Sequence, residues 1–409
     1  MIEPDALLSH LERRLPAALD LLRQMVGINS WTENPNGVDH VGRVTAEAFA
    51  PFGFSRQLVA SADPAHGHHL LMTRPGSDQR TIAMVSHLDT VFPPEEEVRN
   101  HFRWSVEGSR AFGPGTHDIK GGTVMMWLVL DALQQLARPA FEATTWRLFW
   151  NAAEETLSPD FGDLCRSQLG PDTHAALVFE AEGRGPGVRR MVVGRKGRAT
   201  WRVRVSGRGA HAGTQHARGA NAIVQIARVV DRIAALSDAD TDRTFNVGTI
   251  RGGAGLNRVP HFAEAEGEFR AFTPAAYAAG RSRFLSLGGP GDVISPVDGF
   301  PCTVEATIVN ETRPWPRNPA TDQLMTAFQA MGSVLGQSVE PEMRGGLSDG
   351  NHLWDHVPTL DGLGPSGDND HCSERSPDGT KLPEYVDLDS FVPKAALNAL
   401  AILRMLAPG

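Results

Sequence analysis

The sequence lacks the features of several large classes of protein. Its only cysteines, Cys165, Cys302 and Cys372, are an odd and scattered set, which argues against a disulfide framework. No apolar stretch approaches the roughly 20 residues that cross a membrane. The N-terminus has no basic segment followed by an apolar core, so no signal peptide is expected. These absences together predict a cytoplasmic protein.

Lysine is also scarce, and no basic run occurs. The only lysines are Lys120, Lys196, Lys381 and Lys394, so arginine supplies nearly all of the positive charge. We interpret this bias as codon usage, with carboxylate recognition by arginine as the weaker alternative. The net charge of −9 and the pI near 5.9 argue against a nucleic-acid-binding surface.

The remaining composition is that of an ordinary globular protein. Hydrophobic residues make up 41% of the chain and charged residues 21%. A chain of 409 residues is too long for a single ordinary core. We therefore expect two domains and no membrane or nucleic-acid partner.

Side chains that bind metal ions recur along the sequence, and most of them follow a run that predicts a buried strand. These runs are Thr81–Val85, Trp146–Trp150 and Ala175–Phe179. The candidate ligands and their neighbours are His87, Asp89, Asp118, Glu154, Glu155, Glu180 and the late His371. Strands that end in such residues bring them to one edge of a parallel sheet, where α/β folds bind ligands. Imidazole nitrogen mixed with carboxylate oxygen suits zinc or a similar divalent ion.

Each candidate also has a simpler interpretation. His87 and Asp89 would form a hydrogen-bonded pair at a sheet edge, Asp118 would cap the following helix, and Glu154 with Glu155 would be a solvated turn. Several other histidines have no assigned role. The joint pattern, at successive strand ends beside glycine-rich turns, nevertheless favours a metal site.

Hydrophobic periodicity predicts the domain organisation. Strand, loop and helix alternate to about Val193, which is typical of a parallel sheet covered by helices. From about residue 196 to residue 310 the order becomes β-α-β-β-α-β, the ferredoxin-like pattern. Helices return at Ala320–Leu335 and Phe391–Leu406 and are expected to pack on the first domain. We therefore predict an α/β catalytic domain of residues 1–195 and 311–409 with an inserted α+β domain of residues 196–310.

Eight segments give the chain a resemblance to the M20 family of metallopeptidases, in the group of glutamate carboxypeptidase, acetylornithine deacetylase and succinyl-diaminopimelate desuccinylase. They span nearly the whole chain in the family's order. They are Ser86–Thr90, Gly113–Gly122, Ala153–Glu155, Phe179–Glu180, Gly209–Gly213, Asn257–Pro260, Gly345–Asp349 and His371. The resemblance implies a zinc-peptidase-like catalytic domain, with a mixed, mainly parallel sheet, and an inserted lid and dimerisation domain.

The resemblance also implies a site with two zinc ions per subunit, with Co²⁺ or Mn²⁺ as alternatives. Asp118 would bridge the ions, His87 and Glu180 would complete the ligands of one, and Glu155 and His371 those of the other. The ions would lie about 3.5–4 Å apart and share a water molecule.

Two neighbours of these ligands would assist the reaction. Glu154 would be the general base that takes the proton of the water and passes it to the leaving nitrogen. Asp89 would hold the other nitrogen of the His87 imidazole.

The inserted domain would contribute to substrate binding. By resemblance, His211 crosses a dimer interface and stabilises the oxyanion. The residues expected near a substrate carboxylate are Asn257, Arg270, Arg344, Gly345 and Gly346. The implied function is hydrolysis of an amide bond next to a free carboxylate in a dipeptide or N-acyl amino acid, by a homodimer. An N-acyl amino acid deacylase is the alternative.

Three features leave other possibilities open. Glu182 could compete with Glu180 as a ligand, and residues 372–383 form an insertion after His371 that would reshape the substrate pocket. The Gly346–Gly350 segment matches the nucleophile elbow of serine hydrolases, with Ser348 as nucleophile, although a poor strand precedes it. A non-catalytic relative that binds metal or amino-acid conjugates would have lost the base or a ligand, and none is missing.

Overall fold

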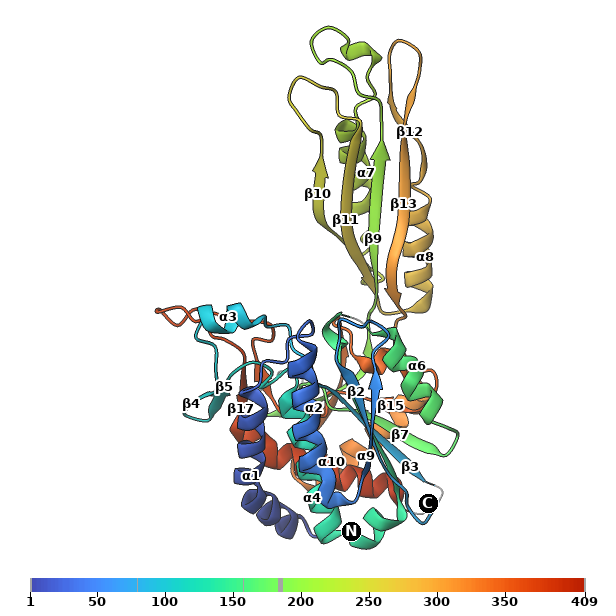
Figure 1. Cartoon of the computed structure of the whole chain (residues 1–409). Coiled ribbons are helices and arrows are strands. Elements are labelled where there is room, and N and C mark those ends of the chain that lie inside the picture. The colour runs from blue at the N-terminus through green and yellow to red at the C-terminus, as the bar shows by residue number, and fades with distance from the viewer. Residues whose placement is uncertain (1, 79, 157, 183–186, 408–409) are drawn as a thin grey trace. The chain divides into compact units, whose positions relative to one another are not determined.

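The structure is a computed structural model that describes residues 2–78, 80–156, 158–182 and 187–407. The chain folds into two compact units (Figure 1). The first consists of Met1–Val193, Arg317–Met343 and Ser348–Gly409, and the second of Gly194–Pro316 and Arg344–Leu347. The segment 196–310, predicted as an inserted domain, lies within the second unit.

A six-stranded mixed sheet forms the centre of the first unit. Its strands, in spatial order, are β1 (Ser55–Ala60), β2 (His68–Arg74), β6 (Thr145–Asn151), β3 (Thr81–His87), β7 (Thr173–Val178) and β15 (Thr359–Leu360). The strands from β6 to β15 are parallel to one another. At the other edge β2 pairs antiparallel with β6, and β1 pairs antiparallel with β2. Every residue of β3 is buried, because helices cover both faces of the sheet.

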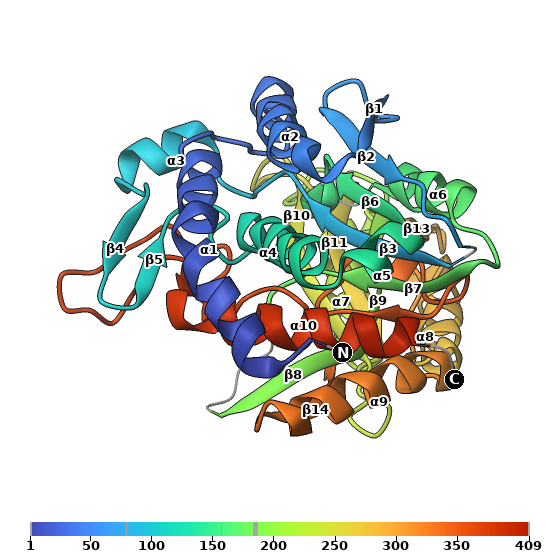
Figure 2. The same ribbon diagram turned by 90° about the horizontal axis from the view of Figure 1, so that it is seen from below.

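Helices cover the sheet on both sides. On one face α1 (Pro4–Val26), α4 (Lys120–Leu136) and α10 (Phe391–Leu406) contact one another, and Figure 2 shows them side by side. Their fully buried leucines join the main core of this unit. On the other face α6 (Pro159–Gln168) packs Phe161 and Cys165 into a smaller apolar cluster. No helix in the described part of the chain is long and apolar enough to cross a membrane.

The remaining helices and strands of the first unit lie around this centre. The longer helices are α2 (Pro35–Phe49) and α9 (Pro319–Val334), and the shorter ones are α3 (Pro94–Arg99) and α5 (Arg138–Ala143). A small antiparallel sheet consists of β16 (Gly367–Asp368), β17 (Tyr385–Asp387), β5 (Arg110–Phe112) and β4 (Ser105–Glu107). A further pair is formed by β8 (Val188–Arg195) and β14 (Ser338–Arg344). As predicted, α9 and α10 pack in the first unit.

The second unit is an antiparallel sheet with two helices. In chain order its elements are β9 (Gly197–Ser206), α7 (Ala222–Ala234), β10 (Thr244–Gly252), β11 (Phe262–Ala271), α8 (Pro274–Leu285), β12 (Gly289–Ile294) and β13 (Pro301–Thr312). The spatial order of the strands is β10-β11-β9-β13-β12. Both helices bury apolar side chains against residues such as Trp201 and Phe269.

The predicted β-α-β-β-α-β order is therefore present, with one strand more than the sequence indicated. The additional strand, β12, begins Gly289-Pro-Gly291, which the sequence pattern treats as a turn. A strand at the edge of a sheet tolerates proline and glycine because only one side of its backbone must pair. The fold is the predicted class, a mixed α/β unit with a separate antiparallel sheet domain.

Candidate metal centre

One group of metal-binding side chains lies where the parallel strands end. His87 is the last residue of β3, and Glu180 follows the end of the neighbouring β7. Asp118 comes from the loop before α4. The Nε2 atom of His87 lies 3.1 Å from Oδ1 of Asp118 and 3.8 Å from Oε1 of Glu180. These three side chains therefore converge on one point at the sheet edge.

A second group shares Asp118 with the first. The Nε2 atom of His371 lies 3.3 Å from Oδ2 of Asp118 and 3.3 Å from Oε2 of Glu155. In each group the potential ligand atoms lie within 4.8 Å of one another. Asp118 presents one oxygen to each histidine, which is the arrangement needed for a carboxylate that bridges two ions. The structure thus brings together all five side chains predicted as ligands.

The charges of the site fit divalent cations. Burial and the nearby Asp118 raise the pKa of Glu155 to about 7, and Oε1 of Glu155 is buried with no hydrogen-bond partner among the described residues. Hydrogen bonds with Asp118 and Glu155 raise the pKa of His371 to about 11. Carboxyl groups outnumber imidazoles here, so bound cations would supply the missing positive charge. A donor set of imidazole nitrogen and carboxylate oxygen suits Zn²⁺.

Asp89 connects the two groups of ligands. Its side chain is fully buried, and Oδ1 lies 3.3 Å from Nδ1 of His87. The same carboxylate accepts hydrogen bonds from the backbone N–H groups of Glu154 (3.1 Å) and Glu155 (3.2 Å) and from the hydroxyl of Thr32 (2.7 Å). The Asp89 carbonyl also lies 3.1 Å from Nδ1 of His87. Asp89 thus contacts the His87 ring and holds the turn that presents Glu155, and the sequence did not indicate the second contact.

Glu154 lies next to the candidate ligands in the chain and belongs to neither group. It begins the short η2 helix (Glu154–Thr156) after β6, and its carboxylate makes no hydrogen bond to any described residue. Burial raises its pKa well above the ordinary value, and the charges of Glu180 and Asp349 raise it further against the opposing effect of His87. A largely buried, unbonded carboxylate with a high proton affinity is suited to accept a proton.

Two further residues near the candidate ligands, Asn151 and Asp349, were not predicted from the sequence. Asn151, the last residue of β6, accepts hydrogen bonds from the Ala153 N–H (3.0 Å) and the Ser158 hydroxyl (2.6 Å). Its amide donates to Oδ1 of Asp349 at 2.8 Å. Burial raises the pKa of Asp349 to about 7. The available signal was the position of Asn151, which ends its strand beside His87 in register.

The serine hydrolase alternative is not supported by these contacts. The Ser348 hydroxyl donates to Oδ2 of Asp361 at 2.8 Å and accepts from the Gly350 N–H at 3.1 Å. Ser348 thereby caps the short η4 helix (Asp349–His352). His371, which follows Ser348 in the chain, pairs with Asp118 and Glu155. Ser348 is a capping residue.

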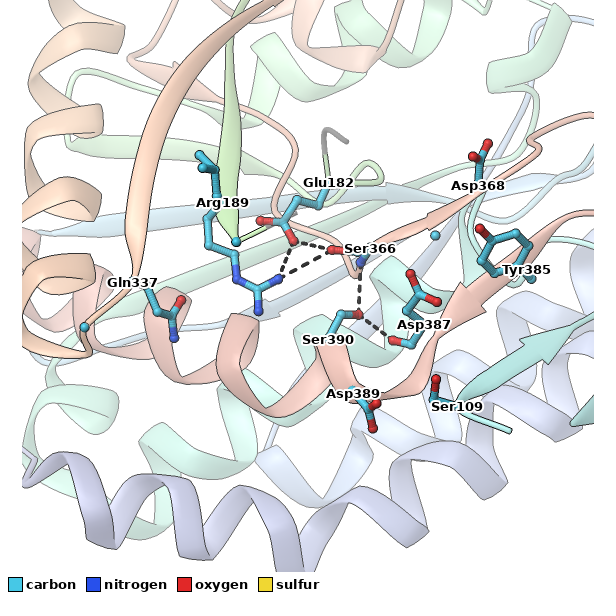
Figure 3. Close-up of a pocket in the computed structure, with 14 residues that line it drawn as sticks. Ser109, Glu182, Arg189, Gln337, Ser366, Asp368, Tyr385, Asp387, Asp389 and Ser390 are labelled. Carbon is cyan, nitrogen blue, oxygen red and sulfur yellow. Dashed lines mark hydrogen bonds and ion pairs between the residues drawn. The ribbon is translucent and has the colours of Figure 1, made fainter. Parts of the chain in front are cut away.

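Glu182, which by residue type could compete with Glu180 as a ligand, has another role in the structure. Its Oε1 accepts from Nζ of Lys394 at 3.0 Å, and its Oε2 from Nη1 of Arg189 at 2.7 Å. Figure 3 shows Glu182 bonded to Arg189 and Ser366 in the wall of a pocket that contains none of the proposed ligands. Both carboxylate oxygens are therefore engaged in ion pairs.

The insertion of residues 372–383 packs against α3, β4 and β5. The Ser373 hydroxyl accepts from the Asn100 amide at 2.6 Å. Arg375 pairs with Glu107 at 3.0 Å and lies over the ring of Phe112. The insertion adds to the small sheet, and Cys372 belongs to neither ligand group.

His211 occupies an exposed loop of the second unit. Its Nδ1 accepts hydrogen bonds from the N–H groups of Gly213 (3.2 Å) and Thr214 (3.1 Å). Because Nδ1 accepts, the proton of the neutral ring resides on Nε2. Asn257 belongs to the same loop cluster, since its carbonyl accepts from the Ala212 N–H at 2.9 Å. His211 thus presents an N–H donor next to Asn257.

Arg270 lies at the opposite end of the same sheet. Its guanidinium donates to Oε1 of Glu268 (2.7 Å) and to the Gly345 carbonyl (2.9 Å). Arg344 and Gly346 join this end through backbone hydrogen bonds with Lys196 and the side chain of Arg195. The length of β11 separates Arg270 from Asn257, about 30 Å at the usual rise of a strand. The predicted substrate residues therefore form two separate groups.

The chain resembles known proteins along most of its length. Residues 193–279 match a peptidase dimerisation domain. Carboxypeptidase G2 of Pseudomonas sp. (strain RS-16) is 24% identical over 399 residues, which cover 96% of this chain and 90% of that protein. An uncharacterised protein of Bacillus subtilis is also 24% identical and covers 85% of this chain and 89% of its own length.

Several solved structures share the fold. A tripeptidase from Staphylococcus aureus superposes with a TM-score of 0.76 at 20% identity and covers 99% of both chains. An M20 family metallo-carboxypeptidase from Sulfolobus solfataricus gives 0.67 at 13% identity, with 95% of this chain and 99% of that one covered. A dinuclear metal binding M20 peptidase from Bacillus subtilis gives 0.65 at 13% identity, with 96% and 98% covered.

A mixed α/β unit with two groups of ligands at its sheet edge, joined to a dimerisation domain, defines a metallopeptidase. In its fold and in the match of residues 193–279 to a peptidase dimerisation domain, the chain is similar to peptidases of the M20 family.

Proposed function

We propose that this protein acts as a carboxypeptidase that cleaves the amide bond next to a free carboxylate, in a dipeptide or N-acyl amino acid. The observation that carries the proposal is the environment of Glu154. Its backbone is held by Asp89 beside the ligand Glu155, and its own carboxylate has no hydrogen-bond partner in the described residues. The similarity to carboxypeptidase G2 over 96% of the chain supports the carboxypeptidase activity.

The side chains of the two groups would divide the work as follows. His87, Glu180 and Asp118 would hold one zinc ion, and Asp118, Glu155 and His371 the other. When bound, such ions polarise the scissile carbonyl and lower the pKa of the attacking water. Glu154 takes the proton from that water and delivers it to the leaving nitrogen.

His211 would stabilise the negative charge that develops on the carbonyl oxygen. Its Nδ1 is engaged by two backbone N–H groups, so Nε2 is the donor. A donor fixed in advance costs no reorganisation during the reaction, which is why such groups contribute strongly to catalysis.

The substrate carboxylate would bind to Arg270, with Gly345 and Gly346 shaping the loop around it. Glu268 orients the guanidinium of Arg270, and a planar guanidinium grips a carboxylate with two hydrogen bonds. Arg344 and Asn257 are the other proposed contacts. Because Asn257 and Arg270 lie at opposite ends of one sheet, one substrate would meet both only if two subunits contribute. We therefore propose a homodimer in which His211 and Asn257 act in the partner's site.

The test is hydrolysis of a panel of dipeptides and N-acyl amino acids, followed by mass spectrometry, with chelator-treated protein before and after addition of zinc. We expect cleavage only after zinc is restored, with selectivity for the amino acid that carries the free carboxylate. Selectivity for the acyl group with tolerance of the leaving amino acid would instead indicate a deacylase. A folded protein that binds two zinc ions and cleaves nothing would refute the hydrolytic function on these substrates.

A further inference from the structure

The second ligand group depends on His371, which lies in a largely exposed loop. His371 lies in the turn between β16 and β17, and its side chain is 53% exposed. Asn369 and His371 both have left-handed backbone conformations, with φ of 65° and 63°. A residue with a side chain rarely adopts such a conformation, and it persists only when surrounding contacts impose it. Contacts of the neighbouring residues in the loop therefore matter for the position of His371.

One such contact joins the His371 loop to the Asp118 loop. Nδ1 of His117 donates a hydrogen bond to the carboxylate of Asp370. The His117 side chain is 4% exposed, and its ring lies against Gly367, where an added Cβ would come within 2.7 Å of the ring. Asp370, which precedes His371, is thus hydrogen-bonded to the buried His117, which precedes Asp118.

Glu384 provides a second connection between the same two loops. Its Oε1 accepts hydrogen bonds from the backbone N–H groups of His117 (2.9 Å) and Asp118 (3.1 Å). Its own N–H donates to the carbonyl of Cys372 at 2.8 Å. Glu384 therefore fixes the backbone on the far side of His371, and the His117–Asp370 pair connects the near side to the Asp118 loop.

The first ligand group has no such dependence. His87 and Glu180 are supplied by β3 and β7, neighbouring strands of the buried sheet. The two groups share one ligand, Asp118. A change that loosens the His371 loop should therefore weaken the second group and leave the first intact.

We propose that the His117–Asp370 pair positions His371 against Asp118 and so sets the affinity of the second metal ion. Neither residue belongs to a ligand group, so both act through the ligands as positioning residues. The inference rests on the proposed two-ion site. Residues that hydrogen-bond to metal ligands without touching the metal typically change the affinity for the metal by about 10–100-fold when they are mutated.

The experiment is a zinc titration of chelator-stripped protein by equilibrium dialysis. We expect two zinc ions per subunit in the unaltered protein. Asp370→Ala and His117→Phe, which keeps a ring against Gly367, should each weaken one site by about 10-fold or more and leave the other unchanged. The double variant should lose no more zinc affinity than the single variant with the larger loss, because both substitutions remove the same bond. Asp370→Asn, which keeps an acceptor, should recover part of the affinity.

Glu374→Gln is the matched control. Glu374 lies in the same loop beyond His371 and is also ion-paired, but with Lys381, so both zinc affinities should stay unchanged. Equal weakening of both sites by Asp370→Ala, or no weakening of either, would overturn the positioning role. Retention of the stronger site serves as the test of folding in each variant. An unaltered protein that binds no zinc would contradict the proposed function itself, which is a different result.

Discussion

Glu154 and Glu155 are adjacent, yet their carboxyl groups have different surroundings. Oε2 of Glu155 lies 3.3 Å from His371 and faces the second ligand group, whereas the Glu154 carboxylate makes no hydrogen bond within the described chain. The Asp89 carboxylate accepts hydrogen bonds from the backbone N–H groups of both glutamates. It thereby fixes the turn from which the two side chains diverge. The buried carboxylate of Asp89 thereby holds apart the proposed ligand Glu155 and the proposed base Glu154.

The first prediction concerns Glu154. In Glu154→Gln the side chain keeps its size and loses its ability to accept a proton. We expect both zinc ions to be retained and kcat to fall by about 10²–10⁴-fold, the usual contribution of a general base. Steady-state kinetics with metal analysis measures this. Full turnover in this variant would remove Glu154 from the role of base.

At the scale of elements, α10 is attached to the loop after β7 by a buried ion pair. Nζ of Lys394 donates to Oε1 of Glu182 at 3.0 Å and to the Gly362 carbonyl at 2.8 Å. The two side chains are 0% and 1% exposed. Arg189 also pairs with Glu182. This contact connects the last helix to the segment that follows Glu180.

The second prediction follows from this burial. Lys394→Met leaves the Glu182 carboxylate without one of its cations, so we expect the free energy of unfolding to fall by about 3 kcal/mol. Denaturant unfolding measures it. The control is Lys381→Met, since Lys381 and Glu374 form an exposed pair and its loss should barely change stability. Equal stability of the two variants would show that the buried pair contributes little.

At the scale of the whole molecule, the sheet of the second unit separates two groups of proposed substrate residues. His211 and Asn257 lie beyond one end of β11, and Arg270 with Gly345 at the other. A change of side-chain rotamer cannot bridge the length of β11, so the two groups of one subunit stay apart. If both groups contact one substrate, two copies of the chain must build each site.

The third prediction tests this arrangement by mixing subunits. His211→Ala alone should lower kcat more than it raises KM, because the lost donor acts on the transition state. When Glu154→Gln and His211→Ala subunits are reassociated, a heterodimer has one site with both residues intact. We expect about a quarter of the unaltered activity, since half of the dimers carry one such site. No recovery, or an active monomer by light scattering, would contradict action in trans.

The sequence determined the class of this protein and the members of both ligand groups. His87, Glu155 and Glu180 follow buried strands of recognisable pattern, and parallel strands bring their ends to one edge whatever the details of packing. The order of elements in the second unit was also predictable from periodicity, except for β12, because a short edge strand that begins with glycine and proline has no apolar alternation.

Only the tertiary structure decided which polar groups face the ligands. Glu182 has the residue type of a ligand, but Lys394, which lies 212 positions later in the chain, engages it. The hydrogen bonds of Asp89 to the turn at Glu154, and of Asp370 to His117, join segments that are distant in sequence. Such pairings depend on side-chain direction and burial, which are set when the elements pack and which local sequence patterns do not encode.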